Sequence, residues 1–194
     1  MRQFLYLFAH PNYSHSVTNK SLLEEVFQHS QFLFRDLYEI YADFHIDVKR
    51  EQELLNNYDG LILHFPMRWY SMPSLLKEWI DVVLTPGFAF GPKGNKLEEK
   101  FLVPIITAGG SQPSYQYEGA NHCPLPLYLL PLEQTARFCK MQYLRPIIFY
   151  GVHRYSENEI WKAREDFREE LNLLVSKQSL ATFSALKHLE DSAP

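Results

Sequence analysis

The chain has 194 residues, of which 46% are hydrophobic and 22% are charged, a composition typical of one globular domain and unlike that of disordered or fibrous proteins. Its formal net charge of −4 provides no basic field for nucleic acid, so a nucleic-acid-binding protein is not expected. Aromatic residues make up 15% of the chain, which predicts either a ring-rich core or a surface that holds a planar ligand or a partner.

In chain order, continuous apolar runs alternate with stretches whose apolar residues recur at helical spacing. Apolar runs of this kind are typical of strands buried on both faces of a parallel sheet. The predicted elements are strand Gln3–Ala9, a helix over about residues 17–29, strand Phe32–Tyr38, helix Val48–Leu55, strand Gly60–Phe65, helix Pro73–Val83, strand Phe101–Thr107, helix Leu125–Cys139, strand Tyr143–Tyr150 and helix Ile160–Leu174.

Five strands alternating with five helices predict an α/β domain with an open, doubly wound parallel sheet, because each crossover places a helix on one face or the other. The natural strand order for five strands is 2-1-3-4-5. We expect residues 1–176 to form this domain and leave 177–194 unassigned. Ligands bind such sheets beyond the carboxyl ends of the strands, so the loops after strands one, three and four should converge on one site.

The two cysteines and the N-terminal segment bear on the compartment. Cys123 and Cys139 are too few for a disulfide framework and have no metal-ligand spacing, which indicates a reducing compartment and no metal site. The first apolar run leads directly into His10-Pro11 without a cleavage site, and no run approaches the roughly 20 residues of a membrane span. A cytoplasmic protein is therefore expected.

The loop after the first strand carries short polar donors and no glycine. Ser16, Thr18 and Asn19 stand at the start of a predicted helix, where free backbone N–H groups and the helix dipole favour an anion such as a phosphate monoester. A serine N-cap without any ligand explains these residues equally well. His10, taken alone, is more often a loop histidine than a ligand contact.

Two further loops suggest a planar ligand. Trp69 and Tyr70 stand between Pro66 and Pro73, where large rings can form one wall of a cleft; an aromatic lid over a small core is the alternative. Gly109-Gly110 lets backbone N–H groups approach a ligand closely, although a simple turn also needs glycine. A phosphate cradle, an aromatic wall and a polar rim are the three features that flavin mononucleotide (FMN) requires.

Several motifs occur in order over residues 1–175: His10-Pro11 followed by Ser16-Val-Thr-Asn19, Asp36-Leu-Tyr38, Pro66-x-x-Trp-Tyr-Ser-x-Pro73 with Leu75-Leu-Lys-Glu-Trp-Ile-Asp81, Gly87-Phe-Ala-Phe-Gly91, and Thr107-x-Gly-Gly110. With them the chain resembles the flavodoxin-like NAD(P)H:quinone oxidoreductases. The resemblance is strongest to the bacterial branch that contains general stress oxidoreductases and the ancillary proteins of Kef-type potassium efflux systems.

The resemblance implies a flavodoxin-like fold and a homodimer that binds FMN non-covalently near the subunit interface. It implies ping-pong transfer of a hydride from NADPH or NADH through the flavin to a quinone or another small electrophilic acceptor. A redox-sensing regulatory subunit of a Kef-type antiporter, peripheral at the inner face of the membrane, is the alternative function. An electron-shuttling flavodoxin is disfavoured, because the acidic excess is only four charges.

Carried over residue by residue, the resemblance also implies a site. Tyr115 falls where the quinone reductases have a tyrosine near the flavin, but Asn121 replaces its companion histidine, and His122 is adjacent. Arg68 stands where the family often has an apolar residue or Gln, and its charge could reach the flavin edge or a nucleotide phosphate. Tyr115, Arg68 and His122 are therefore the catalytic candidates. The expected cofactor-binding residues are His10, Ser16, Val17, Thr18, Asn19, Pro66, Met67, Arg68, Trp69, Thr107, Ala108, Gly109 and Gly110.

Overall fold

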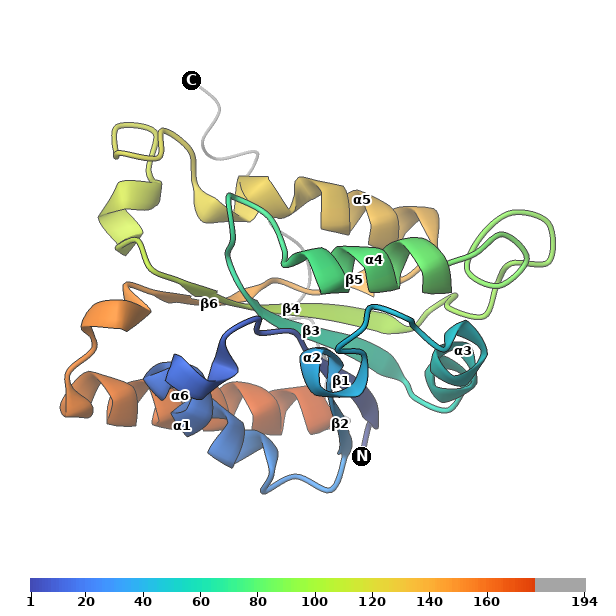
Figure 1. The fold of residues 1–194 in the computed structure, drawn as a ribbon, viewed down its shortest axis with the longest axis horizontal. Coiled ribbons are helices and arrows are strands. Elements are labelled where there is room, and N and C mark those ends of the chain that lie inside the picture. Colours follow the sequence, from blue (N-terminus) through green and yellow to red (C-terminus); the bar gives the residue numbers. More distant parts are fainter. Residues whose placement is uncertain (177–194) are drawn as a thin grey trace.

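The computed structural model describes residues 1–176, so the unassigned segment 177–194 lies outside the described residues. Within residues 1–176 the strands form one parallel sheet in the order β2-β1-β3-β4-β5, with β6 also paired to β4 (Figure 1). The predicted order 2-1-3-4-5 is confirmed. The strands are β1 (Phe4–Phe8), β2 (Phe32–Asp36), β3 (Gly60–Pro66), β4 (Phe101–Ala108), β5 (Gln142–Tyr143) and β6 (Ile147–Tyr150).

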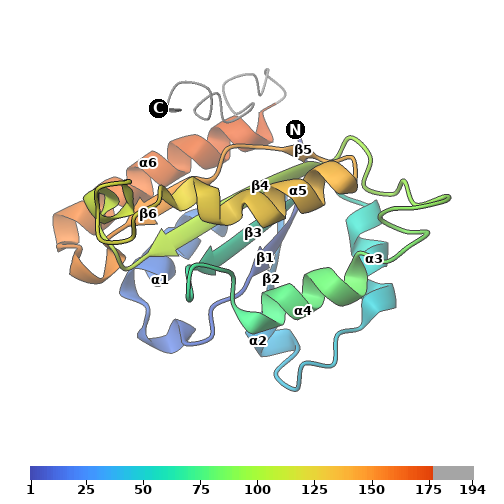
Figure 2. The ribbon, with the colours of Figure 1, turned by 90° about the horizontal axis from the view of Figure 1, so that it is seen from above.

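Helices cover both faces of the sheet, as two views show (Figure 1, Figure 2). Helices α1 and α6 pack together on one face, and α3, α4 and α5 lie on the other. Among residues 1–176, no helix combines the length and apolar character needed to cross a bilayer. The helices are α1 (Val17–Val26), α2 (Leu37–Ile40), α3 (Val48–Asn56), α4 (Ser74–Val83), α5 (Leu130–Phe138) and α6 (Glu157–Val175).

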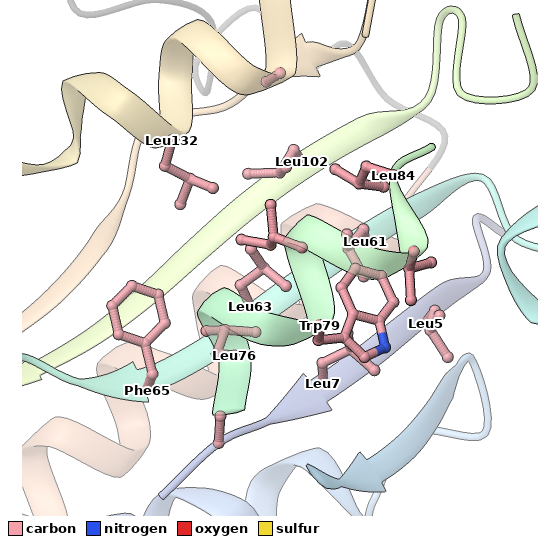
Figure 3. Packing of buried hydrophobic residues seen from close by; sticks show 14 of the residues in the cluster. Leu5, Leu7, Leu61, Leu63, Phe65, Leu76, Trp79, Leu84, Leu102 and Leu132 are labelled. Carbon is pink, nitrogen blue, oxygen red and sulfur yellow. The ribbon is translucent and has the colours of Figure 1, made fainter. Parts of the chain in front are cut away.

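The sheet has a hydrophobic core on each face, and the side chains of successive residues in each central strand point alternately into one core and the other. On the α4 side, Leu5 and Leu7 of β1 pack with Trp79 of α4, whose large indole is fully buried (Figure 3). On the α1 and α6 side the core is rich in rings, because Phe4, Tyr6 and Phe8 of β1 meet aromatic residues of neighbouring strands and of α6 there. The aromatic residues of the chain are therefore shared between the two cores, with others such as Tyr41, Phe65 and Trp79 on the α4 side.

The predicted fifth strand, Tyr143–Tyr150, is divided in two. β5 pairs with Phe101–Leu102 of β4, and β6 pairs with Ile105–Ala108. Three residues of the edge chain lie opposite two residues of β4 at the break, so the edge holds one extra residue, as in a β-bulge. Pro146 precedes β6 directly and has no N–H to donate to the ladder, which explains why the strand breaks there.

Two other predicted elements also differ. The predicted helix Leu125–Cys139 is a 3₁₀ turn over Leu125–Leu129 followed by α5, and Pro131 is tolerated because it lies in the first turn of α5, where no N–H is needed. Leu37 and Tyr38, predicted as the end of a strand, begin α2 instead. The Asp36 carboxylate caps this helix by accepting hydrogen bonds from the amides of Tyr38 (3.0 Å) and Glu39 (3.3 Å).

Candidate functional site

A cavity of about 380 Å³ lies at the carboxyl-end loops of the sheet. The loops after β1, β3 and β4 line it, as predicted, and the segment after β6 completes it. The predicted cofactor-binding residues that line this cavity are His10, Ser16, Val17, Thr18, Asn19, Pro66, Met67, Arg68, Thr107 and Gly109.

The first turn of α1 presents free backbone donors at this cavity. Ser16 caps the helix, and its Oγ accepts hydrogen bonds from the amide (3.4 Å) and the side-chain Nδ2 (2.9 Å) of Asn19. Within residues 1–176, the amides of Val17 and Thr18 have no acceptor, as expected for the first turn of a helix. Two backbone N–H groups and the positive end of the helix dipole are therefore available to an anion.

Asn19 joins this turn to the sheet. Its side chain is buried, and Nδ2 also donates to Oγ1 of Thr107 at 3.2 Å. Its Oδ1 has no hydrogen-bond partner within residues 1–176, although almost all buried polar atoms in proteins are paired. A buried, unpaired acceptor on a residue that lines a cavity indicates a place for a donor group of a bound molecule or a water.

The charge of the cavity favours anions. Arg68, His15 and His153 line it together with His10, and none of its lining residues is an Asp or Glu. Burial, and to a lesser extent the charge of Arg68, lowers the pKa of His10 to about 4, so His10 is neutral near pH 7. The amide of Asn12 donates to its Nδ1 (3.2 Å), which leaves the ring proton of the neutral imidazole on Nε2, where it can serve a ligand.

The loop between β3 and α4 contains a strained turn. Arg68 and Ser71 exchange two backbone hydrogen bonds of 2.8 and 3.0 Å, and the two residues between them, Trp69 and Tyr70, have φ angles of 47° and 62°. Two-residue turns with positive φ at both positions normally contain Asn and Gly. Bulky residues in this conformation cost about 1–3 kcal/mol each, and such strain is concentrated at functional sites.

Trp69 does not line the cavity. Its side chain is 94% exposed, and it projects from the strained turn into solvent. Pro66, Met67 and Arg68 from the same loop do line the cavity, and Met67 is anchored to β4 by a 2.8 Å hydrogen bond from its amide to the carbonyl of Thr107. The loop therefore contributes its first half to the cavity and exposes its aromatic half.

The two predicted glycines are both constrained by neighbouring side chains. A Cβ on Gly109 would lie 2.7 Å from the ring of His153, and one on Gly110 would lie 2.9 Å from Ser114 Oγ and from the ring of Tyr115. Gly109 lines the cavity, whereas Gly110 does not; Ala108 is buried in β4. A side chain at either position would therefore displace a neighbour even without a ligand: His153 of the segment after β6 at Gly109, and Ser114 or Tyr115 of the same loop at Gly110.

Of the three predicted catalytic residues, only Arg68 lines the cavity. Tyr115 is 6% exposed and packs between the rings of Tyr128 and Tyr150, at centroid distances of 6.3 and 5.8 Å. Burial, followed by the proximity of Tyr70, raises the pKa of its hydroxyl. His122 is exposed and lies outside the cavity, in the left-handed conformation with φ 53°.

The site predicted from the sequence did not include the segment that follows β6. Val152, His153 and Tyr155 line the cavity together with Ile160 of α6, and the Thr18 hydroxyl donates to the carbonyl of Val152 at 3.1 Å. The loop after β1 adds Asn12 and His15 in the same way. The rule that ligands bind beyond the carboxyl ends of parallel strands applies to the last strand as well, and this signal could have identified the segment.

A larger cavity of about 610 Å³ lies along β6 and α6. It contains none of the predicted site residues, and several of its charged side chains already pair with one another, as Lys162 does with Asp166. The smaller cavity is therefore the candidate site.

Comparison with known proteins identifies the family. Residues 2–171 match the family model for the flavodoxin-like fold. The chain is 43% identical over 152 residues to the glutathione-regulated potassium-efflux system ancillary protein KefG of Salmonella paratyphi C, a match that covers 78% of this chain and 83% of KefG.

Two solved structures are also similar. The general stress protein 14 of Treponema denticola, determined in complex with FMN, superposes with a TM-score of 0.82 at 35% identity and covers 89% of this chain and 97% of its own. An NADPH-quinone reductase from P. pentosaceus superposes with a TM-score of 0.79 at 28% identity, covering 87% of this chain and 96% of its own. These matches confirm the resemblance inferred from the motifs, and the chain belongs to the family of proteins with the flavodoxin-like fold.

Proposed function

We propose that the protein is an FMN-dependent NAD(P)H:quinone oxidoreductase. The observation that carries this proposal is the cavity at the carboxyl ends of the strands, which combines the free amides of Val17 and Thr18 with a lining that holds no carboxylate. Such a site suits a phosphate monoester, and FMN bears one at the end of its ribityl chain.

The donors and acceptors of the cavity fit FMN. The amides of the first turn of α1, the Ser16 hydroxyl and the Nε2–H of His10 would donate to the phosphate and the ribityl chain, and the Thr18 hydroxyl, which donates to the carbonyl of Val152, would accept from a ribityl hydroxyl. The unpaired Oδ1 of Asn19 offers an acceptor for a ribityl hydroxyl. The Pro66–Arg68 segment and Gly109 would lie along the ring system, with backbone donors for its polar edge.

FMN, when bound, would supply the two-electron chemistry for ping-pong hydride transfer from NADPH or NADH to a quinone or another small electrophilic acceptor. The contribution of this chain is to bind, orient and stabilise charge. The Arg68 guanidinium would offset negative charge on the reduced ring or bind a phosphate of the nicotinamide nucleotide. For Tyr115 and His122, a catalytic role rests on the family resemblance alone.

The comparisons support this proposal. The general stress protein 14 of Treponema denticola was determined with FMN, and the P. pentosaceus protein is described as an NADPH-quinone reductase. We further propose that the protein is cytoplasmic and that it forms a homodimer. The homodimer is proposed because a second subunit or substrate would cover exposed rings such as Trp69 (94% exposed) and Phe138 (62% exposed).

The experiment is to purify the protein, release any bound cofactor by heat and identify it by chromatography, then add NADPH or NADH anaerobically. We expect FMN, bleaching of its absorption by the reduced nucleotide, and recovery of the yellow colour when a quinone is added. A colourless protein that FMN cannot reconstitute would contradict the proposal, and bleaching without reoxidation by quinones would exclude quinones as acceptors.

A second candidate function is favoured by the 43% identity to KefG, an ancillary protein of a potassium-efflux system. In this case the same FMN site would make the protein a redox-sensing subunit of a Kef-type membrane antiporter. An enzyme should show rapid ping-pong turnover in solution. A regulatory subunit should turn over slowly and co-sediment with membranes that contain the antiporter, but not with membranes that lack it.

A further inference from the structure

Asn121 uses all of its polar groups to tie three segments together beside the cavity. Its amide donates to the carbonyl of Ser114 (2.9 Å), and its Nδ2 donates to the hydroxyl of Ser114 (3.2 Å). Its Oδ1 accepts from the hydroxyl of Tyr70 (3.3 Å), and its carbonyl accepts from the hydroxyl of Tyr128 (2.9 Å). Through its side chain and its backbone, this one residue therefore connects the loop after β3, the loop after β4 and the 3₁₀ turn before α5.

Tyr70 is the point at which this network reaches the strained turn. Besides the hydrogen bond to Asn121, its ring packs on that of Tyr128 at a centroid distance of 5.0 Å and an angle of 30°. Tyr70 and Trp69 are the two positive-φ residues of the Arg68–Ser71 turn. Bulky residues keep such a conformation only where surrounding contacts impose it. The hydrogen bond of Tyr70 to Asn121 and its ring contact with Tyr128 are contacts of this kind.

The other end of the network lies against Gly110. A Cβ at Gly110 would come within 2.9 Å of Ser114 Oγ and 3.6 Å of Asn121 Nδ2, so the network packs directly on the glycine loop. Asn121 thus fixes the distance between this loop and the turn that carries Trp69.

We propose that Tyr70 and Asn121 form a clamp that holds Trp69 in position for the planar second substrate, so that they determine the affinity for that substrate and not for FMN. This inference rests on the proposed function. The two residues are positioning residues: they act through Trp69, and neither lines the cavity. The backbone of Trp69 is then fixed in the turn, and its indole, 94% exposed, is free to stack on a ring that binds after the cofactor.

The first test needs no cofactor. Hydrogen exchange of the Arg68 and Ser71 amides, measured in FMN-free protein, should accelerate in Tyr70→Phe and in Asn121→Ala. Asn121→Asp keeps the acceptor for the Tyr70 hydroxyl but loses the donor to Ser114, so its exchange should fall between that of the wild type and that of Asn121→Ala. The matched control is Tyr117→Phe, because Tyr117 is 55% exposed on the same loop and its hydroxyl makes no hydrogen bond within residues 1–176. Unchanged exchange in Tyr70→Phe would overturn the clamp.

The second test uses the FMN-loaded protein. Tyr70→Phe should raise the KM for a quinone roughly three- to tenfold, the effect of losing one hydrogen bond, while kcat and the Kd for FMN stay within about twofold. Tyr117→Phe should change neither constant. An unchanged KM, or an equal loss of FMN affinity, would overturn the assigned role. A wild-type protein that binds no FMN would instead contradict the proposed function and leave the exchange result intact, so the two failures are distinguishable.

Discussion

The hydroxyl group of Tyr6 on β1 lies 2.7 Å from Nδ1 of His64 on β3, and neither side chain is exposed to solvent. The His64 ring is enclosed by the rings of Phe8 and Phe167, at centroid distances of 5.1 and 6.3 Å. Its Nε2 has no partner within residues 1–176. This burial lowers the pKa of His64 to about 3, so the core holds a histidine that is neutral throughout the physiological range.

The first prediction concerns stability in acid. The unfolded chain protonates His64 near its ordinary pKa of 6.5, but the folded protein does so only near 3, so the unfolded state binds more protons between these values. The free energy of unfolding should therefore fall as the pH decreases from 6.5, by about 1.4 kcal/mol per pH unit for this residue. His10, with a pKa of about 4, should add to the loss above that value. Urea titrations across this range measure the slope.

The control for this prediction is His64→Asn, whose side-chain amide can occupy the position of Nδ1 and keep the hydrogen bond to Tyr6 without titrating. We expect a shallower slope in this variant. Equal slopes in the variant and the wild type would show that His64 does not titrate as its burial predicts.

A second prediction concerns a buried carboxylate. Glu51 of α3 is fully buried and accepts hydrogen bonds from the indole of Trp79 (2.9 Å) and the hydroxyl of Tyr41 (2.6 Å), while it forms an ion pair with Arg35. Glu51→Ala removes the acceptor of the buried Trp79 and Tyr41 donors and the carboxylate that pairs with Arg35, which keeps only its 3.3 Å hydrogen bond to the Tyr41 hydroxyl. We expect the free energy of unfolding to fall by about 3–5 kcal/mol, measured by urea denaturation.

The matched control is Glu98→Ala, which breaks a solvent-exposed ion pair with Lys140. This substitution should cost at most about 1 kcal/mol. If the two variants lost equal stability, the buried network would contribute no more than an ordinary surface pair.

A third prediction distinguishes the contribution of Ser16 to helix capping from its contribution to phosphate binding. Ser16→Ala removes the cap of α1, and Ser156→Ala removes the cap of α6; Ser16 lines the cavity, whereas Ser156 does not. Each should cost about 1 kcal/mol of stability. Only Ser16→Ala should weaken FMN, and it should leave the affinity for riboflavin, which has no phosphate, unchanged. Calorimetric titration with both flavins measures this, and equal losses for FMN and riboflavin would place the phosphate elsewhere.

The fold was largely predictable because hydrophobic periodicity and strand order depend on local residue patterns. The apolar runs located β1, β3 and β4 correctly, and alternation with helices gave the parallel order. The errors occurred where a single residue overrides a pattern. Pro146 breaks the fifth strand, and Asp36 caps a helix where the apolar pattern favoured a strand.

The candidate site was predictable in part. The polar residues after β1 and the Pro66–Arg68 segment converge because the carboxyl ends of parallel strands meet. No periodic signal shows that Trp69 is turned into solvent or that Tyr115 is buried, because both depend on contacts between loops that are distant in sequence. The carboxyl-end rule could have indicated the segment that holds His153, but no local pattern shows the approach of His153 to Gly109, which is a tertiary contact between the ends of β4 and β6.

The last prediction tests that contact. Gly109→Ala should place a methyl group 2.7 Å from the ring of His153, so the segment after β6 must move, and we expect lower thermal stability together with weaker FMN binding. His153→Ala removes the obstructing ring, and the double variant should therefore recover the stability that Gly109→Ala loses. If FMN affinity recovers as well, Gly109 serves mainly to accommodate His153. If stability returns without FMN affinity, the small size of Gly109 is also needed for close approach of the cofactor. A double variant as unstable as Gly109→Ala would show that the contact with His153 is not what makes the added methyl group destabilising.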